Sequence, residues 1–194
     1  MVHYKLSYFD IRGRAESIRE VFVVAGVEFE DCRISSEDWP TLKPNTPFGQ
    51  MPLLEVDGKQ LSQSISILRF LGRTFNLAGK TPLEDAKIDM IIDQLVDLNN
   101  DINPYLGEKL HADVFVPNRD KHFGQLKKFL NGNGFILGDR LTWADIHIAE
   151  QLNFVHDKIP GALDGFPELK AYMEKVQSTP KLKKYLATRP PAPF

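Results

Sequence analysis

A tyrosine stands where a strand-like stretch near the start of the chain gives way to a helical pattern. Tyr8 ends the β-favouring run 4–8, and apolar residues at helical spacing follow over 14–25. The start of a helix presents unpaired N–H groups and partial positive charge, which stabilise a nearby anion by about 0.3–1 kcal/mol. Tyr8 is therefore a candidate hydrogen-bond donor to a bound anion. The alternative is a half-buried strand tyrosine that only packs.

Two further places combine backbone groups with polar side chains. Met51-Pro52 precedes a strand, where a turned backbone would present the N–H and C=O of Met51 to a peptide-like ligand. A trans proline at a strand entry is the commoner interpretation of such a pair. Gln63-Ser64 opens a helix, so a hydroxyl, an amide and free N–H groups are available to bind a carboxylate. Helix capping alone also explains the serine.

The proline-bearing loop 35–47 holds a tryptophan and a lysine. Trp39 either packs down or forms the wall of a ligand site, and Lys43 either pairs with a carboxylate or is solvated. Further along, aspartates recur at every fourth position from Asp85 to Asp101, and like charges at that spacing repel by roughly a few tenths of a kcal/mol per pair. One or two of them are expected to have a cationic partner. Asp97, in the middle of the helix expected over 85–105, is the candidate.

Composition narrows the class of protein. A net charge of −2, with 42% hydrophobic and 26% charged residues, is typical of a globular protein without a nucleic-acid partner. No apolar run reaches the roughly 20 residues that span a bilayer, so a membrane partner is not expected. Cys32 is the only cysteine, which excludes a disulfide within one chain and suits the reducing cytoplasm. The five histidines show neither paired spacing nor an HExxH motif, so no metal site is expected.

The elements that carry these residues change character near residue 80. The first part has the order β-α-β, loop, β-β-α, with a hairpin about Asp57-Gly58, and lacks redox cysteines. A Gly/Pro-bearing connector at 77–82 follows, and only helical periods come after it: 85–105, 117–130, 142–158 and 167–186. The sequence therefore predicts an α/β thioredoxin-like N-terminal domain, residues 1–79, and an all-α helical C-terminal domain, residues 82–194.

The order of the motifs is more specific than any one of them. The relevant stretches are Tyr8–Glu16, Trp39-Pro40 with Lys43, Pro47–Pro52, Gln63-Ser64 and Gly138–Asp145. In this order they resemble the glutathione S-transferases, sigma class, and details of both chain ends resemble the nematode branch of that class. The last stretch is similar to the family's G-D-x-[LV]-T-x-A-D motif, and the likeness covers nearly the whole chain.

This resemblance implies catalytic roles for Tyr8 and Arg14, with glutathione as co-substrate and no metal. The Tyr8 hydroxyl would donate to the glutathione sulfur, and Arg14 would add positive charge nearby. A free thiol has a pKa of about 8.5, and lowering it by about 2 requires about 2.7 kcal/mol of thiolate stabilisation. The residues implied to bind glutathione are Tyr8, Trp39, Lys43, Gly49, Gln50, Met51, Gln63, Ser64 and Asp97.

The resemblance also implies partners. Asp97 matches the position that reaches the glutathione of a neighbouring subunit, which implies a homodimer. The second substrates would be small hydrophobic electrophiles, with Phe9 and Tyr105 as pocket walls. The chain is shorter than the family pattern between Tyr105 and Asn118, near that pocket, and again near 132–134.

The function implied is cytoplasmic conjugation of electrophiles for detoxification, with peroxide reduction as a further activity of the same thiolate. Two alternatives stay open. One is a glutathione-dependent prostaglandin D synthase, and the other is a non-catalytic protein that binds haem or fatty acids.

Overall fold

The computed structural model describes residues 2–102, 112–130 and 134–190. Contacts divide the chain into two compact units, each with its own packing. Unit 1 comprises Met1–Ala78 and Thr179–Phe194, and unit 2 comprises Gly79–Ser178. The sheet and the sequence-predicted residues that surround Tyr8 belong to unit 1.

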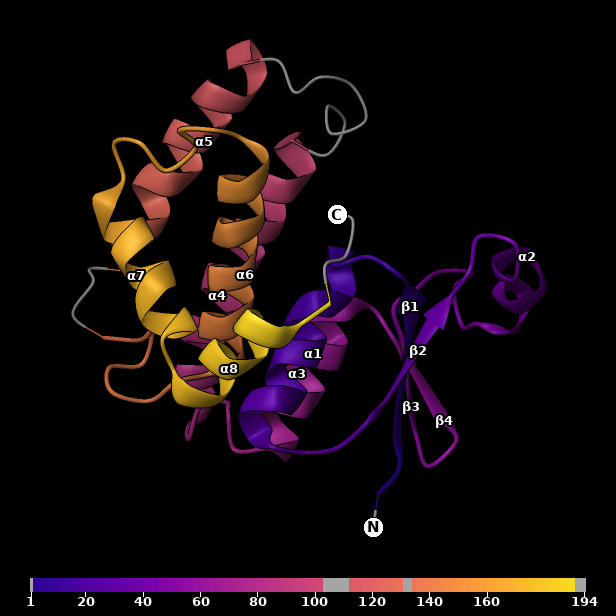
Figure 1. Ribbon diagram of the computed structural model, residues 1–194. Helices are drawn as coiled ribbons and strands as arrows, with labels where there is room; N and C mark the ends of the chain where they lie inside the picture. Colours follow the sequence, from indigo (N-terminus) through magenta and orange to yellow (C-terminus); the bar gives the residue numbers. More distant parts are fainter. Residues whose placement is uncertain (1, 103–111, 131–133, 191–194) are drawn as a thin grey trace. The chain divides into compact units, whose positions relative to one another are not determined.

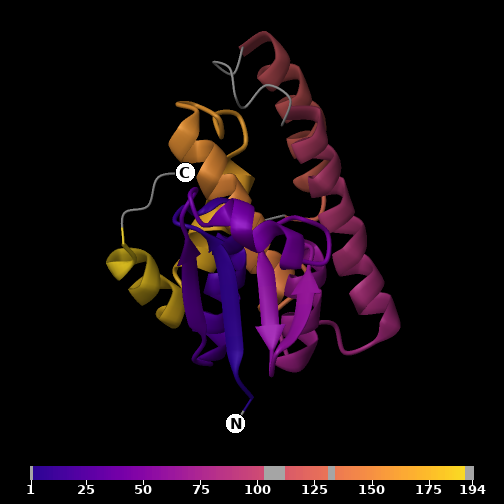
Figure 2. The ribbon, with the colours of Figure 1, turned by 90° about the vertical axis from the view of Figure 1, so that its right-hand side faces the viewer.

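Unit 1 is built on a four-stranded mixed sheet (Figure 2). The strand order is β2-β1-β3-β4; β1 runs parallel to β2 and antiparallel to β3, and β4 pairs antiparallel with β3. The hairpin predicted from Asp57-Gly58 is present, with both residues at positive φ. The strands are β1 (Tyr4–Phe9), β2 (Glu30–Ile34), β3 (Leu53–Val56) and β4 (Lys59–Ser62). This is the predicted thioredoxin-like order.

Two helices pack side by side on this sheet (Figure 1): α1 (Glu16–Ala25) and α3 (Ser64–Thr74). A 3-10 turn, η1 (Gly13–Ala15), leads into α1, which ends at Gly26 in the left-handed conformation (φ 73) as its position predicts. Aromatic rings from β1, α1 and the end of α3 (Tyr4, Phe22 and Phe75) meet in the core between them. The proline-bearing loop forms two short pieces, α2 (Trp39–Leu42) and η2 (Lys43–Asn45).

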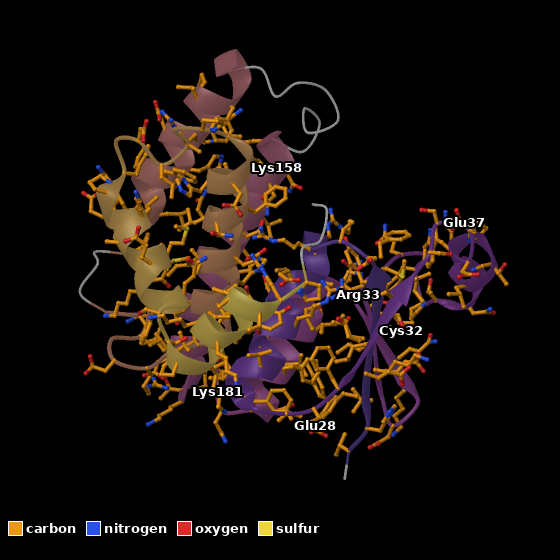
Figure 3. All side chains as sticks on the ribbon, viewed as in Figure 1. Glu28, Cys32, Arg33, Glu37, Lys158 and Lys181 are labelled. Atoms are coloured by element: carbon orange, nitrogen blue, oxygen red, sulfur yellow. The ribbon has the colours of Figure 1, made fainter. Side chains whose placement is uncertain are left out.

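The last predicted helix, 167–186, is in fact two helices. They are α7 (Pro167–Gln177) and α8 (Pro180–Thr188), separated by Thr179 in an extended conformation (φ −59, ψ 135). The prediction of one helix was wrong because the residue before a proline is driven out of the helical region. In unit 1, α8 packs against α1, where Lys181 Nζ donates to the Val24 carbonyl at 3.0 Å (Figure 3). By contacts, then, this last segment groups with the sheet rather than with the helical unit to which the range 82–194 assigned it.

Unit 2 is helical in its described residues. Its helices are α4 (Pro82–Ile102), α5 (Ala112–Leu126), α6 (Trp143–Lys158) and α7. The capping box expected at Thr142 is present: Asp145 N donates to Thr142 Oγ1, and Thr142 N donates back to the carboxylate. The expected fold class, an α/β thioredoxin-like domain followed by a helical one, is confirmed. Within 2–102, 112–130 and 134–190, no helix is both long and apolar enough to cross a membrane.

Candidate active site

Three strand ends meet at one edge of the sheet. Leu53, at the start of β3, pairs with Ser7 near the end of β1 and with Ser62 at the end of β4. The segments that follow β1 and β4 and the segment that precedes β3 therefore lie side by side at this end of the sheet. The sequence-predicted site residues that come directly beyond the paired positions are Tyr8, Met51-Pro52 and Gln63-Ser64.

The hydroxyl of Tyr8 is placed as a donor. Its side chain is 8% exposed, and its Oη accepts a hydrogen bond from the backbone N–H of Arg14 at 3.2 Å. Because that bond uses an oxygen lone pair, the phenolic hydrogen remains available to donate. Accepting one hydrogen bond polarises the O–H group and strengthens the bond that it donates in turn. Arg14 itself is exposed and belongs to the 3-10 turn that leads into α1.

Gly13 touches the same phenol, and sequence reasoning did not single it out. Its φ is 41°, and a Cβ at this position would lie 2.7 Å from Tyr8 Oη and 2.9 Å from the ring. Any larger residue would push the hydroxyl from its place and strain the backbone. The signal that was available is a glycine in the turn directly before a helix.

Aromatic rings connect the Tyr8 phenol to the proline-bearing loop, which also carries Lys43. The Tyr8 and Phe9 rings are 5.7 Å apart, and the Phe9 and Trp39 rings are 5.9 Å apart, both edge to face. Trp39 thus packs against the strand end rather than lying free in solvent. Lys43 is exposed, and its Cε would lie 3.4 Å from a Cβ on Gly49, so its stem follows the Gly49 backbone. The Lys43 ammonium is therefore available to an anion.

The two backbone features expected near the strand ends both depart from ordinary geometry. The Met51-Pro52 peptide bond is cis, so the commoner interpretation, a trans proline at the strand entry, is wrong. Gln63 has φ 71 and ψ 111, a region that residues other than glycine rarely occupy, and such strain persists where the surroundings impose it. Ser64 then begins α3, which gives this edge a helix N-terminus with free N–H groups.

Other predicted residues are not brought to this edge by the described contacts. Gln50 is exposed next to Met51, and Asp97 is exposed on α4 in unit 2. Tyr105 lies outside the described residues. Among the evenly spaced aspartates, Asp101 takes two basic partners, Lys121 at 3.3 Å and His122 at 2.8 Å. Hydrogen bonds from His122 and Lys121 hold the pKa of Asp101 below its usual range.

This end of the sheet offers a phenolic donor, a helix N-terminus and the backbone groups at Met51, and the segments that flank it carry the exposed cations Arg14 and Lys43. Such a set suits an extended anionic ligand with peptide groups, whose charged ends meet cations and whose middle meets backbone N–H and C=O groups. In the described part of the chain, no group of three His, Cys, Asp or Glu side chains is arranged to hold a metal ion.

The protein has a thioredoxin-like domain followed by a helical domain, and its candidate site lies at one end of the thioredoxin-like sheet. This combination is typical of the transferases that use glutathione as co-substrate. The family models agree: "Glutathione S-transferase, N-terminal domain" matches residues 4–73 and "Glutathione S-transferase, C-terminal domain" matches residues 103–189. "Glutathione S-transferase 1" of Ascaris suum is 48% identical over 206 residues, with 100% of each chain covered. The chain therefore belongs to the glutathione S-transferase family and is an enzyme of that kind.

Solved structures extend the comparison. A "Nu-class GST from Haemonchus contortus" is 49% identical, with a TM-score of 0.91 and 100% of both chains covered. A "monomeric Na-GST-3" from the hookworm Necator americanus is 49% identical, with a TM-score of 0.94, covering 99% of this chain and 100% of that one. A "prostaglandin synthase D of Nilaparvata lugens" is 35% identical, with a TM-score of 0.89, covering 97% and 100%.

Proposed function

We propose that this glutathione S-transferase conjugates glutathione to small hydrophobic electrophiles as a cytoplasmic detoxifying enzyme, with Tyr8 as the donor that stabilises the glutathione thiolate. The observation that carries the proposal is the hydrogen bond from Arg14 N to Tyr8 Oη, which leaves the phenolic hydrogen for the sulfur. Tyr8 acts as a neutral donor and not as a base. Reduction of small peroxides would use the same thiolate.

The energy required is within reach of these groups. A hydrogen bond to a charged acceptor contributes about 1.5–3 kcal/mol, and a helix N-terminus adds about 0.3–1 kcal/mol. Together with the positive charge of Arg14 they supply the roughly 2.7 kcal/mol that lowers a thiol pKa by about 2. Trp39, Lys43, Gly49, Gln50, Met51, Gln63 and Ser64 would hold the peptide backbone and carboxylates of glutathione.

The test is Tyr8→Phe, measured by steady-state conjugation of an aromatic halide. We expect turnover at neutral pH to fall about 10- to 100-fold while the affinity for glutathione changes less than threefold, because one donor to the reacting atom is removed. Tyr4→Phe is the matched control, since Tyr4 lies on the same face of β1 and is equally buried. Equal turnover in wild type and Tyr8→Phe would refute the assignment.

Two finer features are part of the proposal. We place the enzyme near the sigma class on its N-terminal motifs, while a protein of similar fold, from Haemonchus contortus, is a Nu-class enzyme.

Phe9 is proposed as a wall of the electrophile pocket because its ring lies between those of Tyr8 and Trp39. Tyr105 is proposed as the second wall on the family resemblance alone. A Phe9→Ala variant should raise KM for the electrophile more than KM for glutathione.

Prostaglandin D synthesis is the second candidate function, because an insect "prostaglandin synthase D" has the same fold at 35% identity. The same thiolate would serve that isomerisation. Parallel assays with an aromatic halide and with a prostaglandin endoperoxide separate the two functions. Good endoperoxide turnover without conjugation would favour the synthase, and tight haem or fatty-acid binding without either turnover would favour a binding protein.

We propose a homodimer in which Asp97 approaches the glutathione of the partner. Exposed apolar side chains support a subunit contact: Phe70 on α3 is 37% exposed and Met90 on α4 is 49% exposed. A relative of similar fold is titled monomeric, so the mass in solution is the direct test. Light scattering should give twice the 22.1 kDa of the chain. If the protein is a monomer and is fully active, the proposed role of Asp97 at the glutathione site of a partner subunit is wrong.

A further inference from the structure

Arg19, on α1, is a fully buried cation with contacts in three directions. Its side chain is 1% exposed. Arg19 Nε donates to the two carboxylate oxygens of Asp31 at 3.1 and 3.2 Å, and Nη1 donates to Glu16 Oε2 at 2.9 Å. Nη1 also donates to the backbone carbonyl of Ile11 at 3.0 Å. The rigid guanidinium fork therefore connects a strand, a helix and a turn.

The Ile11 carbonyl belongs to the turn that carries the partners of the Tyr8 phenol. Ile11 N donates to Phe9 O at 2.8 Å, so the turn folds back directly after β1. Two residues further on, Gly13 contacts the phenol, and the next backbone N–H, that of Arg14, donates to Tyr8 Oη. A shift of the Ile11 carbonyl would be passed on to both contacts, because only one residue separates it from Gly13.

Stability alone is a poor explanation for this arrangement. A buried ion pair costs desolvation that its attraction often only balances, and apolar residues of similar size commonly stabilise as much. Arg19 Nη2 is, moreover, buried without a hydrogen-bond partner among the described residues, which adds a further cost. What an arginine supplies here and a leucine would not is a donor fixed on a backbone carbonyl.

The carboxylates that orient Arg19 are held from outside. Asp31 Oδ2 also accepts from Arg33 Nη2 at 2.6 Å, and Arg33, labelled in Figure 3, reaches Asp10 Oδ1 at 3.2 Å. Glu16 Oε1 accepts from Tyr185 Oη at 2.9 Å and from Arg189 Nη1 at 3.1 Å, both from the α8 end of unit 1. Both carboxylates that bind Arg19 therefore have further donors of their own, while the contact with the Ile11 carbonyl is made by Arg19 itself.

We propose that Arg19 is a positioning residue for Tyr8: by holding the Ile11 carbonyl, it fixes the turn whose amide bonds the phenol. This inference rests on the proposed role of Tyr8 as donor to the thiolate. Arg19 is assigned no catalytic role, because its side chain is buried and its donors bind Asp31, Glu16 and the Ile11 carbonyl. Its effect on the reaction is the orientation that it imposes on the Tyr8 hydroxyl.

Arg19→Lys tests the proposal, because it keeps a cation beside Glu16 and Asp31 but removes the fork that reaches the Ile11 carbonyl. We expect kcat/KM at neutral pH to fall about fivefold to tenfold, since small misplacements of a catalytic group are costly. The profile of kcat/KM against pH should move to higher pH by about half a unit or more, reporting a higher pKa of the bound thiol. Affinity for glutathione should change less than threefold.

Arg189→Lys is the matched control. Arg189 bonds the same Glu16 carboxylate and also pairs with Glu20, both on α1. Its pH profile should stay that of the wild type even if its melting temperature falls. Asp31→Asn is the second variant if Arg19→Lys folds poorly; it loosens Arg19 from β2, and its profile should move in the same direction by less. An unchanged profile in Arg19→Lys, or an equal change in Arg189→Lys, overturns the proposal.

A double variant separates this inference from the proposed function. If Arg19 acts through the phenol, Arg19→Lys should cost less than twofold when it is added to Tyr8→Phe. If Tyr8→Phe is itself fully active, the proposed function fails. If Tyr8→Phe is impaired and Arg19→Lys costs the same factor with and without it, the proposed function stands and the role of Arg19 fails.

Discussion

The two units bury charged groups in different ways. In unit 1, Arg19 joins two carboxylates and a backbone carbonyl, and the turn that it holds leads to the phenol of Tyr8. In unit 2, the buried carboxylate of Asp145 on α6 accepts from Thr142 N and Oγ1 and from Ile136 N, in the loop before α6, and from Tyr172 Oη on α7. The first cluster leads to the phenol of Tyr8 in the candidate active site. The second cluster binds donors of the helices and of the loop before α6.

Because of this difference, the two clusters should control different properties of the protein. The acceptor atoms of Asp145 satisfy N–H and O–H groups that would otherwise be buried without partners, so its removal should affect stability. Burial raises the pKa of Asp145, although the hydrogen bonds from Thr142, Tyr172 and Ile136 oppose that rise. The Arg19 cluster should instead affect the pH profile of the reaction. Four experiments test this contrast between the two units.

Asp145→Ala should have the largest effect on stability. It leaves the amides of Thr142 and Ile136 and the hydroxyl of Tyr172 without their acceptor, so the free energy of unfolding should fall by at least about 3 kcal/mol. Urea unfolding measures it. Tyr172→Phe removes one donor only and should cost about 1–2 kcal/mol. A loss below about 1.5 kcal/mol in Asp145→Ala would show that the cluster of unit 2 is not a stability device.

His147, on α6, should make unit 2 sensitive to acid. Burial lowers its pKa to about 4, whereas an unfolded histidine titrates near 6.5. Between these pH values the unfolded chain binds more protons, so the free energy of unfolding should decline as the pH falls, by roughly 2–3 kcal/mol. His147→Gln should flatten this slope, and replacement of the exposed His156 should not. Parallel slopes for wild type and His147→Gln would contradict the prediction.

Gly13→Ala should act mainly on the reaction. The added methyl displaces the Tyr8 hydroxyl, and we expect kcat/KM to fall about tenfold. The positive φ should cost about 1 kcal/mol of stability as well. Gly58→Ala is the control, because Gly58 also has a positive φ and a Cβ there would meet nothing within 4 Å. Wild-type kinetics in Gly13→Ala would mean that the turn does not set the position of the phenol.

Asp101→Asn should have the smallest effect. Because the pKa of Asp101 is lowered by hydrogen bonds from His122 and Lys121, its contribution is present above about pH 4 and is lost as the pH falls further. The variant should therefore lose less of its own stability than the wild type does on acidification below pH 4. Melting curves between pH 3 and 5 measure this, with the exposed Asp93→Asn as a control. If the melting temperatures of all three proteins depend on pH in the same way, the contacts of Asp101 with Lys121 and His122 do not stabilise the protein.

Much of the fold followed from short-range patterns. The end of α1 at Gly26, the Asp57-Gly58 hairpin and the Thr142–Asp145 capping box each depend on residues within a few positions of one another, so their chemistry is readable along the chain. The break before α8 also had a local signal, Pro180, which the prediction of a single helix passed over. Asp97 and Tyr105 remain predictions of the family resemblance.

The fold class, the family and the set of polar residues around Tyr8 could be predicted from the sequence, because periodicity, caps and motif order are local properties of a chain. The backbone N–H that bonds the phenol, the room that Gly13 leaves for its hydroxyl and the contact of Arg19 with the turn became visible in the folded structure. The reason is distance along the chain: Arg19 meets Asp31 across a helix and a strand, and Arg189 meets Glu16 across 173 residues. Contacts of that kind exist only once the units have packed.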